Sequence, residues 1–437
     1  MENIDILLHA RWVIPVEPLG AVLDNHSVAI RHGRIVDILP SDQAGRRYAA
    51  ATVHNLEHHA LIPGLVNAHA HAAMALMRGL ADDLPLMTWL KEHIWPAEGR
   101  WVAPEFVYQG GLLATAEMLR GGTTCFNDMY FFPGETARAA LSAGMRAAVG
   151  LIVVDFPTAW AKNADEYLHK GLEVHDEYRS NPLISSTMAP HAPYTVSTAS
   201  LERVGVLAEQ LDVPIHMHVH ETAGEVEQAL QQNGQRPLAR LRSIGLLGPR
   251  LCAVHMTQLT DQEIEWVAES GVHVLHCPES NLKLASGFCP VHRLHDAGVN
   301  IGIGTDGAAS NNDLDMFSEM RTAALLAKAV AGDASAFPAA AALQAATLGG
   351  ARAMDLAGEI GSLEVGKAAD ITAVSLADVE TQPVYNPISQ LVYATGRDKV
   401  TDVWVAGRQL LKNRLLTTLD EHELRAIARQ WHARMAK

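Results

Sequence analysis

The segment Leu61-Ile-Pro-Gly-Leu-Val-Asn-Ala-His69-Ala-His71 contains an apolar run that ends in two histidines separated by one residue. Side chains alternate between the two faces of a β-strand, so His69 and His71 point the same way. The pattern therefore predicts a buried strand that brings two imidazoles to one end of a sheet.

Three later apolar runs end in side chains of the same kind. Glu221 follows His218 in the segment His-Met-His-Val-His-Glu, His255 ends the run Leu-Cys-Ala-Val-His, and Asp306 follows Ile-Gly-Ile-Gly-Thr. Two imidazoles on one face, a third from another strand and a carboxylate form a zinc-type ligand set with one position open for water. Each part alone also occurs in ordinary structures, such as a turn at Asp-Gly. Four such strand ends together predict metal-assisted hydrolysis.

The length and charge of the chain limit its possible functions. Its 437 residues are enough for one large barrel domain and a small second domain. The net charge of −15, from 34 Lys and Arg against 49 Asp and Glu, argues against a nucleic-acid or anionic-membrane surface, because both need basic patches. The charge does not exclude a small nucleoside as the substrate.

The sequence also predicts a cytoplasmic protein. The four cysteines, Cys125, Cys252, Cys277 and Cys289, include no Cys-x-x-Cys pair, which favours free thiols in a reducing compartment. The N-terminus lacks the basic segment and apolar segment of a signal peptide. No apolar run reaches the ~20 residues that a membrane span needs.

From about 61 to 365 the sequence repeats an apolar strand, a loop and an amphipathic helix, with helices expected at 105–120 and 198–211. Eight strands that alternate with helices predict an α/β fold, a (β/α)8 TIM barrel. The active site of such a barrel lies at the C-terminal ends of the strands, where all the candidate ligands are. The expected strands are 64–69, 123–129, 146–153, 184–189, 213–218, 251–255, 272–276 and 300–305.

The two ends of the chain, 1–60 and 366–437, consist of short apolar-rich segments with tight turns. The simplest arrangement is one small β-sandwich domain that is built from both ends and flanks the barrel. A charged helix is expected at about 420–437. The expected strands are 4–8, 27–30 and 35–39 in the first part, and 369–374, 390–393, 400–406 and 409–411 in the second.

Several motifs resemble the amidohydrolase superfamily, over nearly the whole chain. They are Pro63-Gly-Leu-Val-Asn-Ala-His-Ala-His71, Gly121-Gly-Thr-Thr-Cys-Phe-Asn-Asp128, Pro190-His-Ala-Pro-Tyr194, His276-Cys-Pro-Glu-Ser-Asn-Leu-Lys-Leu-Ala-Ser-Gly287, Thr305-Asp-Gly-Ala-Ala-Ser-Asn-Asn312 and 361–371. The His218-x-x-Glu221 pair marks the aminohydrolase branch, and the chain is most similar to the 5′-methylthioadenosine/S-adenosylhomocysteine deaminases. Members with a carboxylated lysine place a metal-bridging Lys where this chain has Ala189-Pro-His-Ala, so the resemblance favours a single metal.

The resemblance implies one Zn²⁺ per chain, or another divalent ion such as Fe²⁺ or Mn²⁺. His216 and His220 alternate with His218 and could share its face, but the spacing to Glu221 selects His218 as the ligand. The implied metal ligands are His69, His71, His218 and Asp306. The implied substrate-binding residues are Trp89, Glu98, His191 and Glu221.

The implied reaction is the hydrolytic deamination of an adenine nucleoside, with Glu221, His255 and Asp306 as catalytic residues. Asp306 accepts the proton of the attacking water, Glu221 protonates N1 of the ring and the departing ammonia, and His255 orients the attacking oxygen. Several of the site residues also suit purely structural roles. Glu221 could be the acidic residue at the start of a helix. Glu98 could be a solvated charge and Trp89 a core aromatic residue. His191 could be a structural histidine.

The expected substrate preference depends on whether the sequence offers a cationic side chain for the substrate's carboxylate. The carboxylate of S-adenosylhomocysteine would need a positioned arginine, and segment 155–181 offers only Lys162, Lys170 and Arg179. We therefore expect 5′-methylthioadenosine and adenosine to be preferred over S-adenosylhomocysteine. Apolar surface for a thioether is expected from Trp89, Leu84, Leu86 and Met87.

Two further functions stay open. A deaminase or hydrolase of another heterocycle, such as guanine, 8-oxoguanine or a chlorotriazine, would use the same metal site. A non-catalytic assembly protein is the remote alternative, because such proteins lose ligands that this chain keeps. Zinc deaminases of the cytidine type are excluded, because the chain lacks Pro-Cys-x-x-Cys. The resemblance also implies a homo-oligomer, and it leaves the roles of Asn281, Lys283 and Ser286 open.

Overall fold

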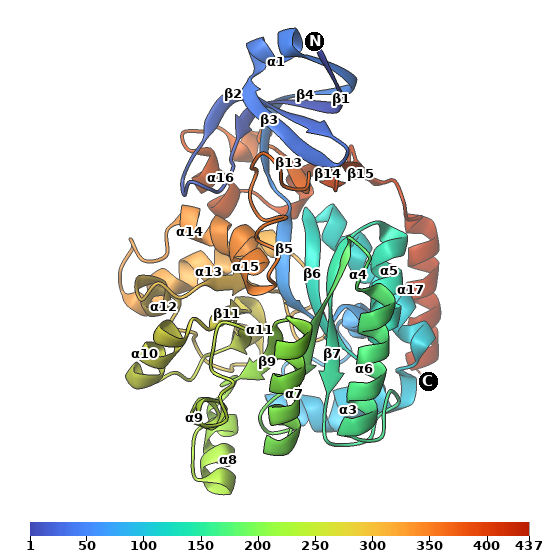
Figure 1. The fold of residues 1–437 in the computed structure, drawn as a ribbon, viewed down its shortest axis with the longest axis vertical. Helices are drawn as coiled ribbons and strands as arrows, with labels where there is room; N and C mark the ends of the chain where they lie inside the picture. The colour runs from blue at the N-terminus through green and yellow to red at the C-terminus, as the bar shows by residue number, and fades with distance from the viewer. Residues whose placement is uncertain (437) are drawn as a thin grey trace.

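The structure, a computed structural model, describes residues 1–436, and its centre is a barrel of eight parallel strands (Figure 1). In order around the barrel the strands are β5 (Leu65–Ala70), β6 (Thr123–Tyr130), β7 (Arg146–Val153), β8 (Ile184–Pro190), β9 (Ile215–Val219), β10 (Leu251–His255), β11 (His273–His276) and β12 (Ile301–Ile303). All eight predicted barrel strands are confirmed, and the TIM-barrel fold with them. The apolar runs that predicted them are the buried strands of the barrel wall.

The first and last strands meet through the residues that follow them. Ala70 and Asp306 form a parallel bridge, and the Asp306 N–H donates to the His69 carbonyl at 3.0 Å. Gly304 permits this approach, because a Cβ at that position would lie 2.6 Å from the His69 backbone nitrogen. Closure of the barrel therefore places Asp306 beside the first histidine of the His-x-His motif.

Helices connect the strands and cover the outside of the barrel (Figure 1). The predicted helices 105–120 and 198–211 are confirmed as α4 and α7. α4 starts with Pro104, whose missing N–H is tolerated at a helix N-terminus, and it ends before Gly121. The helices of this part are α4 (Pro104–Arg120), α5 (Pro133–Ala143), α6 (Ala164–Tyr178), α7 (Thr198–Leu211), α8 (Ala223–Asn233), α9 (Pro237–Ser243), α10 (Asp261–Ser270), α11 (Pro278–Lys283), α12 (Val291–Asp296), α13 (Met316–Ala331), α14 (Ala339–Gln344), η3 (Ala345–Gly349) and α15 (Gly350–Ala353).

The connection between β5 and α4 is long and contributes one wall of the site described below. It consists of short helical segments joined by turns. These are η1 (Ala72–Met77), α2 (Leu86–Thr88), η2 (Trp89–Ile94) and α3 (Trp95–Trp101).

Both ends of the chain form the second domain, as predicted. Its strands make one mixed sheet in the order β16-β15-β14-β13-β4-β1-β2-β3. Leu8 and Ile30 share a core with Trp404, and Ile35 on the edge strand donates to the Lys367 carbonyl, so the sheet curls over that core. The elements are β1 (Glu2–Val13), β2 (Leu23–Arg31), β3 (Arg34–Pro40), α1 (Ser41–Arg47), β4 (Tyr48–Pro63), β13 (Ile371–Ser375), β14 (Val400–Val405), β15 (Arg408–Lys412) and β16 (Leu415–Leu416).

Two details of this domain differ from the prediction. Residues 390–393 are not a strand, because they lie in helix α16 (Pro387–Tyr393), which Asn386 caps and Pro387 starts. The long strand β4 had no predicted counterpart, since exposed polar side chains such as His58 hide its apolar alternation. The division of the chain near residues 60 and 365 stays a prediction.

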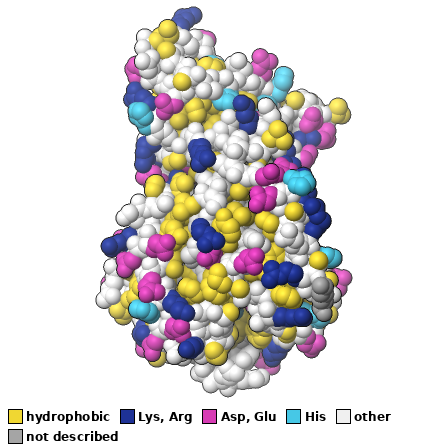
Figure 2. Space-filling view, turned by 90° about the vertical axis from the view of Figure 1, so that its right-hand side faces the viewer, with side chains coloured by type: hydrophobic (Ala, Val, Ile, Leu, Met, Phe, Trp, Pro, Cys, Tyr) yellow, Lys and Arg dark blue, Asp and Glu magenta, His cyan; other side chains and the backbone are white. Residues whose placement is uncertain are grey.

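The predicted C-terminal helix is confirmed as α17 (Glu421–Met435). It packs on α4, where the Trp431 ring meets Phe106 edge to face and the Trp431 N–H donates to Gln109 Oε1 at 2.6 Å. Figure 2 shows the side of the molecule that includes this helix, with acidic and basic side chains interspersed over it. Among residues 1–436, no helix combines the length and apolar character needed to cross a bilayer.

A buried ion pair joins the barrel to the second domain. Arg146, the first residue of β7, places Nε 3.1 Å from Asp370 Oδ2, and both side chains are almost fully buried. The other oxygen of Asp370 accepts the N–H of Ala406, which follows β14, at 2.7 Å. Asp370 therefore connects a barrel strand to the sheet.

We expect Asp370→Ala to destabilise the protein strongly, because it leaves the Arg146 charge buried without its partner. Loss of one member of a buried pair costs about 3–5 kcal/mol. The measurement is the midpoint of thermal unfolding. Asp24→Ala is the matched control, since Asp24 pairs with Arg11 at the surface and such pairs contribute about 0–1 kcal/mol. Equal shifts for the two variants would contradict the prediction.

Candidate active site

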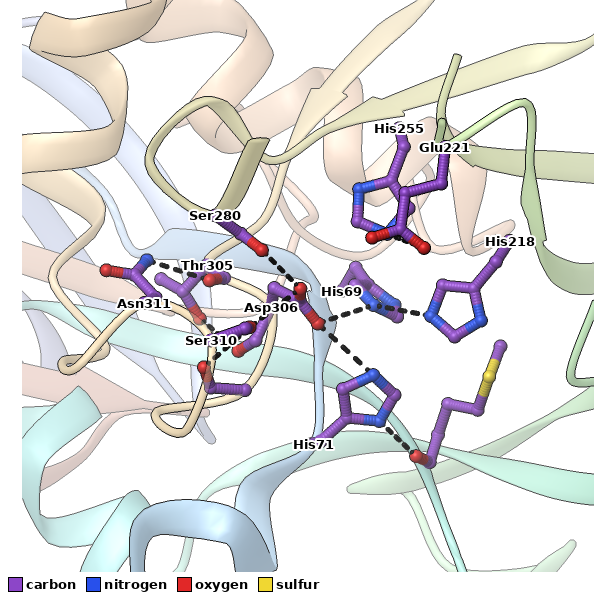
Figure 3. Close-up of polar contacts among 12 residues, drawn as sticks. His69, His71, His218, Glu221, His255, Ser280, Thr305, Asp306, Ser310 and Asn311 are labelled. Carbon is purple, nitrogen blue, oxygen red and sulfur yellow. Dashed lines mark hydrogen bonds and ion pairs between the residues drawn. The ribbon is translucent and has the colours of Figure 1, made fainter. Parts of the chain in front are cut away.

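Three histidines and one aspartate meet at the C-terminal end of the barrel (Figure 3). His69 is in β5 and His71 follows it, His218 is in β9, and Asp306 follows β12. One ligand atom of each residue lies within 4.8 Å of the others. Asp306 Oδ1 is 3.2 Å from Nε2 of both His69 and His71, and Nε2 of His218 is 3.2 Å from Nε2 of His69. The structure thus brings together the four residues predicted as metal ligands.

Each of these histidines has its second ring nitrogen held by a neighbour. Nδ1 of His71 donates to a carbonyl of β6 at 2.5 Å, and Nδ1 of His218 donates to the His191 carbonyl at 2.8 Å. Nδ1 of His69 lies 2.8 Å from Nε2 of His216, which is buried in the barrel interior. A carbonyl only accepts, so in the neutral rings of His71 and His218 the lone pair is on Nε2. This tautomer is the one that a metal ligand needs, and the residues fit a zinc-type ion.

The charges of the cluster also fit a cation. Burial opposes the ionised form of Asp306, but its hydrogen bonds with His69 and His71 hold its pKa well below the usual range. Burial likewise opposes a charge on His71, yet the hydrogen bond to Asp306 raises the pKa of His71 to about 9. Burial lowers the pKa of His69 to about 4. A proton on His71 therefore balances Asp306, and a divalent ion would displace it, since metal ligands must be deprotonated.

Glu221 and His255 lie beside the ligand cluster (Figure 3). Glu221 Oε2 is 3.9 Å from His255 Nε2, and the His255 ring stacks on that of His218 with 5.4 Å between centroids. Burial raises the pKa of Glu221, although the neighbouring His255 opposes the rise. A carboxyl group whose pKa is raised holds its proton to higher pH and is better suited to act as a proton donor. Helix α8 starts after Glu221, with Thr222 as its N-cap and Glu225 in its first turn.

Two of these residues have unusual backbone conformations. His255 has φ of 74° and Asp306 has φ of 61°, in the left-handed region that most side chains avoid. Such conformations cost about 1–3 kcal/mol each and cluster at functional sites. Here they occur where β10 ends and after β12, so that both side chains turn towards the ligand cluster (Figure 3).

The cluster opens into a cavity of about 460 Å³, and the three residues predicted to bind the nucleoside, Trp89, Glu98 and His191, all line it. Tyr130 donates to Glu98 at 2.8 Å, and burial raises the pKa of Glu98 to about 7 although this hydrogen bond opposes the rise. Trp89 also packs in a core cluster, with its N–H donated to the Ala81 carbonyl at 3.1 Å. The cavity thus combines the metal-ligand cluster with a buried carboxyl group and an aromatic wall.

Most of the remaining cavity wall is apolar. None of the described residues that line it is Lys or Arg. Lys170 and Arg179 form ion pairs elsewhere, with Glu166 and Asp176. Of the apolar residues expected beside Trp89, only Leu86 lines the cavity. The wall includes Leu86, Trp95, Phe131, Ile152, Val154 and Phe156.

Three residues had no predicted role, and each interacts with a site residue. The hydroxyls of Ser280 and Ser310 donate to Asp306 Oδ2 at 2.6 and 2.9 Å, and Tyr130 holds Glu98. The position of Tyr130 at the C-terminal end of β6 was a signal that could have identified it. Ser280 and Ser310 lie in motifs that resemble the family, but their partner could not be deduced from spacing.

The structure places the three residues whose roles the sequence leaves open. Asn281 Oδ1 accepts from His255 Nδ1 at 2.8 Å. Lys283 lies outside the cavity lining and pairs with Asp82 at 2.6 Å. Ser286 is buried, and its backbone carbonyl accepts a hydrogen bond from Gln258 Nε2 at 2.9 Å. Only Asn281 therefore acts directly on a candidate catalytic residue.

Comparison with known proteins agrees with this geometry. The model of the amidohydrolase family matches residues 60–410. The chain is 52% identical over 433 residues to a 5-methylthioadenosine/S-adenosylhomocysteine deaminase of Teredinibacter turnerae, covering 99% of this chain and 98% of that one. A protein of the same name from Saccharophagus degradans is 49% identical over 431 residues, with coverage of 99% and 97%.

Solved structures show the same similarity. The crystal structure of an adenosine deaminase from Xanthomonas campestris with bound zinc is 57% identical, with a TM-score of 0.99 and coverage of 100% of this chain and 99% of that one. An atrazine chlorohydrolase from Arthrobacter aurescens in complex with zinc shares the fold, with a TM-score of 0.90, 24% identity and coverage of 98% and 99%.

We expect the purified protein to bind close to one divalent ion per chain at His69, His71, His218 and Asp306. His69→Ala should lose the ion, because it removes a buried ligand from the centre of the cluster. Elemental analysis of both proteins is the measurement, and His58→Ala, at an exposed position, is the control that should keep the ion. Two equivalents per chain, or an ion retained by His69→Ala, would contradict the assignment.

Proposed function

Because this chain belongs to the amidohydrolase family, we propose that it is a metal-dependent aminohydrolase that converts an adenine nucleoside and water into the inosine analogue and ammonia. The observation that carries this proposal is the convergence of the three imidazoles and Asp306 beside Glu221 and His255, in one cavity with Glu98. The names of its relatives and of the 57% identical structure support an adenine nucleoside as the substrate.

We propose Zn²⁺ as the ion, with Fe²⁺ or Mn²⁺ as alternatives. Three nitrogen ligands and one carboxylate oxygen suit zinc, and the 57% identical structure contains it. When bound, such an ion supplies a water nucleophile at neutral pH, because it lowers the pKa of a coordinated water to about 7.

Different residues around the ion carry out the separate proton transfers of the reaction. Asp306 accepts a proton from the attacking water. Glu221, whose pKa is raised by burial, donates a proton to N1 of the purine as water adds to C6. As the C6 carbonyl forms, Glu221 takes the proton of the C6 hydroxyl and passes it to the departing ammonia, and the proton on Asp306 then restores Glu221. His255 hydrogen-bonds the attacking oxygen and stabilises the tetrahedral centre. The C–N bond at C6 breaks, and C6 becomes a carbonyl.

The nucleoside end of the cavity contains the other proposed binding residues. Glu98 accepts hydrogen bonds from the ribose hydroxyls, with Tyr130 holding one of its oxygens. Trp89 packs on the ribose or on the 5′-thioether. His191 contacts the sugar or the purine edge, and its Nδ1 is 3.0 Å from the Thr195 hydroxyl.

Another heterocycle remains the alternative substrate, because the metal site would be the same. The fold shared with the atrazine chlorohydrolase does not favour one, since a fold does not determine the reaction. The buried carboxyl group of Glu98 favours a ribose, which offers two hydroxyl donors. We also propose a cytoplasmic homo-oligomer. The four free, buried cysteines suit a reducing compartment, and the resemblance to the family suggests the assembly.

The proposed reaction is tested with metal-replete protein by ammonia release, and by chloride release where the compound is a chlorotriazine. The panel contains adenosine, 5′-methylthioadenosine, S-adenosylhomocysteine, guanine, 8-oxoguanine and a chlorotriazine. We expect turnover of the adenine nucleosides. Turnover of only the free bases or the chlorotriazine would reject a nucleoside substrate.

We expect Glu221→Gln to keep the ion and lose turnover by about 10²-fold or more, because an amide cannot deliver a proton. The measurements are elemental analysis and kcat with the best nucleoside. Glu227→Gln, on the exposed surface of α8, is the matched control and should behave as the wild type. Near-normal turnover of Glu221→Gln would show that another group protonates N1.

We expect the protein to prefer 5′-methylthioadenosine over S-adenosylhomocysteine. A thioether needs only apolar wall, whereas a desolvated carboxylate without a cation is costly. The difference in kcat/KM should be about 10- to 200-fold. Both substrates are measured side by side at one pH with the zinc-loaded protein. Equal or reversed efficiencies would indicate that a cation from outside this cavity completes the pocket.

A further inference from the structure

Two consecutive residues of the short helix α11 contact two different members of the candidate active site. The Ser280 hydroxyl donates to Asp306 Oδ2 at 2.6 Å, and Asn281 Oδ1 accepts from His255 Nδ1 at 2.8 Å. Neighbouring side chains of a helix point about 100° apart, so one turn can reach towards two strands. Both residues are almost fully buried.

We propose that Ser280 and Asn281 are a pair of positioning residues, in which Ser280 fixes the ligand Asp306 and Asn281 fixes His255. The proposal rests on the function proposed above and deepens it. It assigns separate consequences to the two residues: Ser280 acts on retention of the ion, and Asn281 acts on turnover.

Asn281 determines the orientation and tautomer of His255. Its amide oxygen accepts the Nδ1–H, which leaves the lone pair of the ring on Nε2, the nitrogen nearer to Glu221. Within residues 1–436 this is the only hydrogen bond of the Asn281 side chain, since its Nδ2 has no partner. Nε2 can then accept a hydrogen bond from the attacking water. Without the amide oxygen, nothing selects this tautomer.

Ser280 acts on the oxygen of Asp306 that faces away from the histidines. Oδ1 of Asp306 points at His69 and His71, and Oδ2 is held by Ser280 (Figure 3). With Oδ2 held in this way, Oδ1 is the oxygen that would ligate the ion, and the hydrogen bond to Ser280 opposes rotation of the carboxylate. Ser310 is a second donor at 2.9 Å, but its hydroxyl also lies 3.1 Å from the Gly307 carbonyl. Among the described residues Ser280 has Asp306 as its one side-chain partner.

The test compares Ser280→Ala and Asn281→Leu in the full-length, metal-loaded protein. One measurement is the rate at which the ion is lost to an excess of chelator, and the other is kcat and KM for the best substrate. Groups that hold metal ligands or active-site histidines in place change affinity or activity by about 10- to 100-fold. Ser280→Ala should lose the ion about tenfold faster or more.

Asn281→Leu should show the opposite profile. We expect it to keep the ion as the wild type does, with kcat lowered by about 10- to 100-fold and KM changed by less than about twofold. Asn281→Asp should recover most of this loss, because it keeps an acceptor oxygen at the same place. Leu282→Ala is the matched control, since Leu282 is on the same helix but 44% exposed, and it should change neither quantity.

The outcomes that would overturn the proposal are distinct. If both variants lose the ion and turnover in parallel, the helix is only a structural support. If Asn281→Leu turns over normally, His255 needs no positioning by the amide. Thermal unfolding checks the fold of each variant, and Ser280→Cys and Asn281→Ser replace a variant that fails to fold. The rate of ion loss is measured without substrate, so it tests the Ser280 assignment independently of the proposed function. A wild type that retains its ion but deaminates no nucleoside would reject only the proposed function.

Discussion

Closure of the barrel between its first and last strands is the constraint on which the site depends. The hydrogen bond from the Asp306 N–H to the His69 carbonyl joins residues that lie 237 positions apart in the sequence. It requires Gly304, since a side chain at that position would collide with the His69 backbone. Because the strands are parallel, their C-terminal ends face one way, and closure brings the carboxylate of one end to the imidazoles of the other.

The buried cluster of His69, His71, His218 and Asp306 is stable because each of its side-chain polar atoms that points away from the centre has a hydrogen-bond partner. Buried polar groups are costly when they lack hydrogen bonds. The carbonyls of β6 and of His191 hold two of the imidazoles, and His216 lies against the third. Ser280 and Ser310 hold the outer oxygen of Asp306. The atoms left over all face one point, where a cation would satisfy them together.

The sequence was sufficient for the barrel and for the grouping of the four proposed ligands, because both depend on periodicity and on the ends of apolar runs. His69, His71, His218 and Asp306 each end or follow such a run, so their meeting follows from the fold alone. The contacts of Ser280, Asn281 and Tyr130 depend on loop geometry that spacing does not determine. The helix at 387–393 was mistaken for a strand, although Asn386 and Pro387 are a helix-start signal. Strand β4 was missed because its exposed face is polar.

In the cavity, the residues proposed to carry out the reaction are different from those that line the rest of the wall and would select the substrate. Its ionisable groups are concentrated at the proposed ion ligands, Glu221, His255 and Glu98, whereas residues such as Phe131 and Phe156 form an apolar wall. An atrazine chlorohydrolase has the same fold at 24% identity, so the barrel itself does not select the substrate. Selection must come from the wall, which contains apolar and aromatic groups but no lysine or arginine among the described residues. Such a wall would discriminate by shape and by the cost of burying a charge, which is the physical basis of the proposed preference for a small and uncharged 5′ substituent.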